Sequence, residues 1–424
     1  ILHGAPSYRP SFLAYRFAER RALERLAALA GDDAAATAHR ERAEEIRDRT
    51  EKLLWDDRRE FFLAAFRDDE TADGHTVRAG SRIYDTGRFA GSPHGRELIG
   101  YVPWQFDMPS RGRGYERAWK FLADPAFFQA PFGPSTVERH DPMFLLQPHC
   151  CWWSGQSWPY ATSQTLSALA RVLQERSPGF GNTGDDLQSF VTADDYVRHL
   201  ATFARSHRKG GRPYLAEALH PDTGSFESHD AFNHSEHYFH SSYCDQVITG
   251  LVGLVPRADD TLEIRPLFPE SWSHLRLDRV VYRGREIAVV WDKTGSRYGL
   301  GAGLHLLADG RVLASSPHVG KLVAALPPPV DPGLADEGLR PGLVPERVNL
   351  AVNNDGTYFP RVLASSTAPG TTPERLVDVV VFRDRHDGSE DLEFTDLHVV
   401  PSAGDDGGTE YARGVERAAG GHRG

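Results

Sequence analysis

Two acidic residues of this chain stand in loops that also hold aromatic residues. Asp107 lies in Gly100-Tyr-Val-Pro-Trp-Gln-Phe-Asp-Met-Pro109, which contains Trp104, and Glu217 lies in Tyr214-Leu-Ala-Glu-Ala-Leu-His-Pro-Asp-Thr-Gly224. Acid–base cleavage of a glycosidic bond needs two carboxyl groups flanking the scissile atom, roughly 6.5–9.5 Å apart in an inverting enzyme. Both residues are candidates for this chemistry. The alternative for each is an ordinary solvated loop carboxylate.

A tryptophan-rich stretch supplies groups that could bind a sugar. Residues 149–165 read His-Cys-Cys-Trp-Trp-Ser-Gly-Gln-Ser-Trp-Pro-Tyr-Ala-Thr-Ser-Gln-Thr, with three tryptophans and a tyrosine in nine residues. Aromatic faces can stack on the apolar C–H faces of a sugar while nearby polar atoms bind its hydroxyls. We therefore expect Trp153, Gly155 and Trp158, together with Trp104, to line a substrate subsite. A tryptophan-rich corner of the core is the alternative, and composition alone favours it.

A histidine cluster follows further along the chain. Residues 227–245 contain His229, His234, His237 and His240. Such a cluster could bind a metal or shuttle protons, but it has no HExxH spacing. We therefore expect no metal here, and assign Tyr238 and His240 hydrogen-bonding roles at the pocket wall. We expect structural roles for Cys244 and Asp245.

Other metal and nucleophile patterns are also weak. The adjacent Cys150 and Cys151, with His149, match no zinc spacing, so neither a metal nor a cofactor is expected. A Ser–His–Asp triad could be drawn from residues 227–245, but no G-x-S-x-G elbow is present to hold the serine.

Composition limits the classes of partner. The chain has 424 residues, enough for two or three domains, and a net charge of −11 with no basic block. This balance argues against nucleic acid or an anionic membrane as a partner. No run approaches the roughly 18 apolar residues that a membrane-spanning helix needs, so membrane insertion is not expected.

The first part of the chain is predicted to be helical. Apolar residues recur at helical spacing over residues 10–30 and 34–54, which Gly31-Asp-Asp joins into a hairpin. Further helices are expected at residues 114–122, 162–174 and 192–207. Thr162 or Ser163 is expected to cap the second of these, and Thr192-Ala-Asp-Asp195 opens the third with a capping-box pattern. Helical hairpins between long aromatic loops are typical of an α/α toroid, here too few for a complete six-hairpin barrel.

The sequence pattern changes from helical to β-forming near residue 255. Short β-forming segments follow one another between turns, and Asp309-Gly310 is a strong hairpin signal. We predict a mainly α, multidomain protein, a partial (α/α)6 toroid followed by small antiparallel β-modules. The expected divisions are 1–254 for the toroid, 255–316 for a small β-unit, 317–347 for a Pro/Gly-rich linker, 348–400 for a second β-module and 401–424 for a disordered tail.

Three motifs together resemble a known family. Trp152-Trp-Ser-Gly-Gln-Ser-Trp-Pro159 resembles the aromatic signature of (α/α)6-barrel glycosidases of the family 63 and trehalase type, and Glu217-Ala-Leu-His-Pro-Asp-Thr-Gly224 resembles their general-base segment. Arg96-Glu-Leu-Ile-Gly-Tyr-Val-Pro-Trp104 and the segment from Tyr238 to Leu254 look like bacterial proteins with a mannosylglycerate-hydrolase-like domain. The resemblance covers about residues 8–309. The Asn349-Leu-Ala, Tyr358-Phe-Pro and Ala364-Ser-Ser-Thr segments are similar to the start of a discoidin-type (F5/8 C) carbohydrate-binding module, here incomplete.

The resemblance implies an inverting glycoside hydrolase that acts on an oligosaccharide or glycoside, with an Asp general acid and a Glu general base. Glu217 matches the base. The family's acid precedes the stretch matched here by Ser7-Tyr-Arg-Pro10, so we expect it upstream of Ile1, with Asp107 as a fallback. Ser154 and Gln156 depart from the usual signature, which leaves the sugar open. A secreted or cell-surface location is expected.

Two other functions fit the same residues. A non-catalytic carbohydrate-binding protein would also use aromatic loops and an appended β-module. A polysaccharide lyase on the same toroid would use Tyr238 or His240 as its base, but lyases usually present Arg or Lys to a uronate carboxylate. The aromatic loops with acidic residues fit the lyase less well.

Overall fold

The computed structural model describes residues 6–72, 75–146, 153–176, 187–226 and 242–328, and the backbone of two short strands, β16 (Phe382–Arg383) and β17 (Glu393–Phe394), which pair antiparallel. The chain divides into two compact units. The first comprises residues 1–207 and 215–327, and the second comprises residues 208–214 and 328–424. The predicted second β-module and tail, residues 348–400 and 401–424, otherwise lie outside the described residues.

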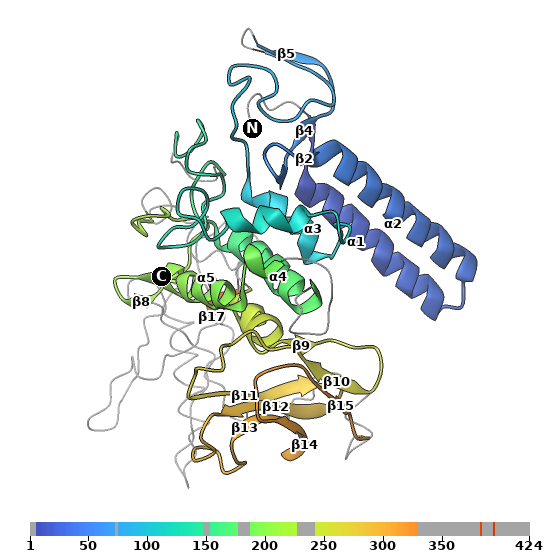
Figure 1. The fold of residues 1–424 in the computed structure, drawn as a ribbon, viewed down its shortest axis with the longest axis vertical. Helices are drawn as coiled ribbons and strands as arrows, with labels where there is room; N and C mark the ends of the chain where they lie inside the picture. Colours follow the sequence, from blue (N-terminus) through green and yellow to red (C-terminus); the bar gives the residue numbers. More distant parts are fainter. Residues whose placement is uncertain are drawn as a thin grey trace, which may run out of the picture. The chain divides into compact units, whose positions relative to one another are not determined.

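The first unit opens with a helical hairpin. Helices α1 (Pro10–Leu29) and α2 (Asp33–Leu54) pack side by side, as Figure 1 shows in blue. Pro10 occupies the first turn of α1, where its missing N–H costs nothing. Gly31 turns the chain with φ +77°, and the Asp32 carboxylate then accepts a hydrogen bond from the Ala35 N–H at 2.9 Å. The hairpin predicted from the apolar spacing is therefore confirmed.

Short elements follow the hairpin and enclose an aromatic core. The strand pairs are β1 (Ser7–Tyr8) with β4 (Ala65–Phe66), β2 (Trp55–Asp56) with β3 (Phe61–Phe62), and β5 (Glu70–Ala72) with β6 (His75–Val77). The short helices are η1 (Leu98–Tyr101), α3 (Val102–Gln105) and η2 (Tyr115–Phe121). The helix expected at 114–122 is therefore a 3-10 helix.

Two longer helices carry the rest of the helical region. Helix α4 (Pro159–Arg176) is almost wholly buried, and α5 (Ala193–Ser206) follows the short turn η4 (Leu187–Ser189). The capping box predicted at the start of α5 is confirmed, because the Thr192 and Asp195 side chains each bond the other's backbone N–H. The expected caps of α4 are wrong. The helix starts at Pro159, and Thr162 is already inside it, with its N–H donating to the Trp158 carbonyl at 2.8 Å.

The remaining elements lead into the β-region. Besides β16 and β17, the second unit contains the antiparallel pair of β7 (Arg208–Lys209) with β8 (Arg212–Pro213). In the first unit, the single turn α6 (Tyr243–Asp245) runs into the π-helical η5 (Gln246–Leu251), and β9 (Leu254–Val255) begins the sheets.

Two antiparallel sheets form the β-region (Figure 1). One contains β11 (His274–Tyr282), β12 (Arg285–Asp292), β13 (Gly303–Ala308) and β14 (Arg311–Ser316) in that order, and the other orders β15 (Leu322–Ala325), β10 (Thr261–Ile264) and β9. Asp309 and Gly310 turn β13 into β14 with φ of +49° and +74°, as a primed hairpin turn requires.

The expected linker begins too early. Residues 322–325 form β15 and pair with β10 along its whole length, so the sheet continues beyond residue 317. The predicted fold class is confirmed, with a helical region that corresponds to part of an α/α toroid followed by small antiparallel sheets. Across the described ranges, no helix is both long and apolar enough to span a membrane.

Candidate active site

The aromatic loop before α4 is compact and closely held. Trp153 and Trp158 stack at a tilt with ring centroids 4.6 Å apart, and Tyr160 meets the edge of Trp153 at 6.4 Å. Trp158 is 4% exposed, whereas Trp153 is only partly buried. Gly155 lies at φ +111°, and a Cβ there would stand 2.8 Å from the Phe144 ring. Only glycine fits at this position, because both its backbone angle and its close neighbour exclude a side chain.

A single preceding segment fixes the shape of this loop. The Thr136 hydroxyl accepts a hydrogen bond from the Gly155 N–H at 3.0 Å, and the Thr136 N–H donates to the Gln156 carbonyl at 3.1 Å. The Leu145 N–H donates to the Ser154 carbonyl at 2.6 Å. These bonds lie at both ends of residues 136–145, which we call the support segment. The backbone of residues 154–156 is therefore held in place by the support segment.

The segment that carries Glu217 lies directly against the aromatic loop. Leu219 and Ser157 form an antiparallel bridge in which each N–H donates to the other's carbonyl at 2.9 Å. Glu217 is partly buried between Ala216 and Ala218, which are both 0% exposed. The structure thus brings the segment that carries Glu217 beside the loop that carries Trp153 and Trp158, although the two are far apart in the sequence.

Several hydrogen bonds hold the turn after Glu217. The His220 ring nitrogen Nδ1 accepts hydrogen bonds from the Asp222 and Thr223 N–H groups at 3.2 and 3.3 Å. The Pro221 carbonyl accepts from the Phe132 N–H at 3.0 Å. Gly224, at φ +69°, lies so close to Phe132 that a Cβ would be 2.6 Å from that ring. The Pro-Asp-Thr-Gly sequence therefore forms a tight turn that packs against an aromatic ring.

Trp104 does not fit its predicted role as a subsite residue. Its side chain is 1% exposed and packs against Phe62 and Trp119 at centroid distances of 5.4 and 5.5 Å. Its indole therefore has no open face for a sugar, and its role is to fill the core. The core alternative therefore holds for Trp104, and it also holds for Trp158 of the tryptophan-rich loop, which is buried in the same hydrophobic cluster.

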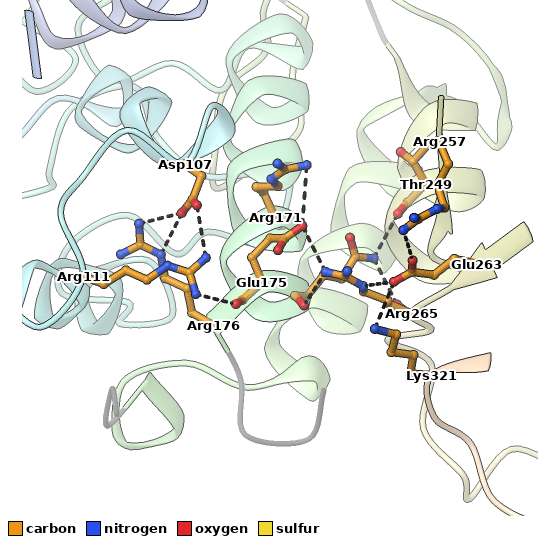
Figure 2. A network of polar contacts seen from close by, with 11 residues as sticks. Asp107, Arg111, Arg171, Glu175, Arg176, Thr249, Arg257, Glu263, Arg265 and Lys321 are labelled. Atoms are coloured by element: carbon orange, nitrogen blue, oxygen red, sulfur yellow. Dashed lines mark hydrogen bonds and ion pairs between the residues drawn. The ribbon is translucent and has the colours of Figure 1, made fainter. Parts of the chain in front are cut away.

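Asp107 also has a structural role. It adopts φ +50°, and its carboxylate accepts from Arg176 Nη2 at 2.6 Å and Nε at 3.0 Å, and from Arg111 at 3.1 Å. Figure 2 shows Asp107 between these two guanidinium groups. Arg176 is itself 1% exposed and also pairs with the buried Glu116. The fallback assignment of Asp107 as an acid is therefore unsupported, because its carboxylate neutralises a buried arginine.

Tyr238 and His240 lie outside the described residues, as do the other three histidines of their cluster and the Cys150–Cys151 pair. Cys244 is an exposed free thiol. Among the residues that the structure does describe, no group of three or more His, Cys, Asp or Glu side chains is arranged to hold a metal ion.

A contact between Tyr160 of this loop and a tyrosine of α1 was not predicted from the sequence. Gln164 Nε2 donates to the Tyr15 hydroxyl at 2.6 Å and to the Tyr160 hydroxyl at 3.3 Å, and both tyrosines are about two-fifths exposed (41% and 38%). A hydrogen bond with Tyr15 raises the pKa of Tyr160 to about 12. Tyr15 lies on α1, far from Tyr160 in sequence, so no local pattern could have revealed the pair.

Comparison with known proteins defines the class. The chain combines a helical region, in which the Glu217 segment lies beside an aromatic loop, with small antiparallel β-sheets. Residues 1–241, more than half of the 424-residue chain, match the mannosylglycerate hydrolase MGH1-like glycoside hydrolase domain. The chain therefore belongs to the MGH1-like glycoside hydrolase family. Residues 256–314 match the C-terminal domain of glycosyl hydrolase family 65.

A solved structure described as a sialidase is similar to this chain. The two share 33% sequence identity, with a TM-score of 0.65 over 76% of this chain. This chain spans only 27% of the length of that structure. The similarity therefore concerns part of a longer protein.

Proposed function

We propose that this chain carries the general base of an inverting glycoside hydrolase, with Glu217 activating the attacking water. Trp153, which is only partly buried, provides the stacking surface for a sugar ring, with the buried Trp158 packed against it, and Gly155 holds their loop in shape. Membership of a glycoside hydrolase family supports the reaction class. The inverting course and the identity of the base rest on the motif around Glu217 and on its position.

One observation carries this proposal. The Ser157–Leu219 bridge brings the Glu217 segment within backbone hydrogen-bond distance of the loop that contains both tryptophans. A base must lie within reach of a water beside the bound sugar, and a stacking platform next to the carboxylate meets this need. Inversion further requires a second carboxyl group roughly 6.5–9.5 Å from Glu217.

The first substrate to test follows from the family. Its description names a mannosylglycerate hydrolase, so mannosylglycerate is the leading candidate for this chain. The similar sialidase makes a sialyl glycoside the second compound to assay. A panel of α- and β-linked disaccharides covers other glycosides.

Replacement of the base tests the assignment. In the full-length protein, Glu217→Gln should lower kcat by roughly 10²–10⁴-fold, the usual contribution of a positioned general base, with KM little changed. Product release should be followed by ¹H NMR, because the anomer that forms first distinguishes inversion from retention. Glu45→Gln, on the exposed face of α2, is the matched control and should remain fully active.

The outcomes separate the candidate functions. Full activity of Glu217→Gln would show that Glu217 is not the base. A ligand that raises the thermal midpoint of the unmodified protein without any product would favour a carbohydrate-binding protein instead.

A further inference from the structure

An ion pair joins the turn after Glu217 to the support segment. Arg139 binds the Asp222 carboxylate through both terminal nitrogens, with Nη1 to Oδ2 at 2.9 Å, and its Nη2 also contacts the Gln129 carbonyl at 3.4 Å. The guanidinium lies over the Phe144 ring, 5.6 Å from its centroid. A bidentate ion pair that also stacks on a ring fixes the relative orientation of its two side chains and not only their charges.

Arg139 belongs to the support segment that also holds the aromatic loop. Thr136, at one end of the segment, holds the aromatic loop through Gly155 and Gln156, and Leu145, at the other end, holds Ser154. Arg139 lies between these anchors and holds the turn that follows Glu217. One segment therefore contacts both halves of the candidate site.

We propose that Arg139 and Asp222 are positioning residues that set the place of Glu217 relative to the Trp153–Trp158 platform. The ion pair at Asp222 then adds an anchor to the backbone bridge at Leu219 and the hydrogen bond to the Pro221 carbonyl. This inference rests on the proposed function of Glu217. Neither residue touches the sugar in this scheme, and both act through the carboxylate of Glu217.

A purely structural role predicts a different result. The Arg139 and Asp222 side chains are 21% and 38% exposed, and a pair at that exposure contributes little to the free energy of unfolding. The turn also keeps its own bonds to His220 and Phe132 without the pair. Loss of the ion pair should therefore leave the protein folded, but should shift the Glu217 segment relative to the aromatic loop. Small displacements of a reacting group are costly in rate.

The test uses the full-length protein and whichever compound of the panel it turns over. Asp222→Asn and Arg139→Met should each lower kcat by about tenfold or more, with KM within about threefold. The thermal midpoint should stay within about 2 °C of that of the unmodified protein, because solvent reaches and screens this partly exposed pair. The reciprocal exchange, Arg139→Asp with Asp222→Arg, should recover part of the lost kcat.

Asp278→Asn is the matched control, since Asp278 pairs with Arg276 in the β-region at a similar exposure of 34%. It should leave kcat unchanged. If Asp222→Asn keeps full kcat while Glu217→Gln is inactive, the positioning role is overturned and the proposed function stands. If Glu217→Gln is itself fully active, the proposed function fails first. A loss of kcat that matches a lower thermal midpoint would also overturn positioning, in favour of a structural role.

Discussion

At the residue scale, His199 on α5 makes stability depend on pH. Its side chain is 4% exposed, and burial lowers its pKa from 6.5 to about 4. Above pH 6.5 the imidazole is neutral in both the folded and the unfolded chain. Below that value the unfolded chain gains a proton that the folded chain does not, so stability is lost as the pH falls towards 4. At pH 4.5 this loss amounts to roughly 2–3 kcal/mol.

His199→Leu should therefore flatten the pH dependence. Urea unfolding of the full-length protein at pH 7 and pH 4.5 measures the difference directly. The variant should lose about 2–3 kcal/mol less than the unmodified protein between these two values. Some dependence will remain, because burial also lowers the pKa of His207. An equal loss in both proteins would show that His199 is solvated or protonated in the folded state.

Asp107 and Glu217 show what sequence can and cannot predict about a single carboxylate. Both lie in aromatic loops, and both were candidates for the same chemistry. Asp107 differs from Glu217 in its partner, because Arg176 at the far end of α4 binds the Asp107 carboxylate. No spacing within the loop of Asp107 encodes that partner. The motif around Glu217 was predictable because its turn is local, whereas its bridge to the aromatic loop became visible only in the fold.

At the scale of elements, short sequence motifs correctly predicted the structures that are held by bonds between neighbouring residues. The capping box of α5 uses residues that are three apart, and the Asp309–Gly310 turn joins adjacent strands, so both were predictable from short stretches. The end of the β-region was not. β15 pairs with β10, which lies far earlier in the chain, and its Pro-rich flank looked like a linker. Tertiary pairing decided that boundary.

Helix α4 connects the candidate site to the β-region. Its first residue follows Trp158, and near its end Gln174 Nε2 donates to the carbonyls of Thr249, Gly250 and Arg265 at 3.0–3.1 Å. Figure 2 shows the charged network beside these bonds, in which Arg265 contacts both Glu175 and the buried Glu263. The end of α4 is therefore tied to η5 and to Arg265, the residue after β10, by neutral and charged contacts together.

Gln174→Met tests the neutral part of this junction. The substitution keeps the length of the side chain and removes the donor for three carbonyls, so it should cost about 1–3 kcal/mol of the free energy of unfolding. Arg171→Met is the control, because Arg171 lies one turn earlier on the same helix in an exposed pair with Glu175 and should cost less than about 1 kcal/mol. Denaturant midpoints of the two variants give the comparison. Equal midpoints would mean that water replaces Gln174 without cost.

At the scale of the whole first unit, one hydrophobic cluster runs from the helical region into the sheets. It contains Trp119, Leu169 from α4, Ile264 from β10 and Trp291 from β12, each at most 2% exposed. The Leu251 carbonyl also accepts a hydrogen bond from the Leu267 N–H at 2.9 Å, so backbone bonds cross the same boundary. A continuous core predicts that the helices and the β-region unfold together, although two family descriptions cover them separately.

Ile264→Ala tests this coupling. Ile264 is 0% exposed, and its truncation should cost about 2–5 kcal/mol, because lost apolar contact and a residual cavity add together. Native-state hydrogen exchange of the full-length protein should then show that amides of α4 lose protection by the same free energy as those of β10. Val312→Ala on the exposed side of β14 is the control, and it should change the protection of neither the α4 amides nor the β10 amides. Unchanged protection in α4 would show that the β-region opens independently, and the site could then persist without it.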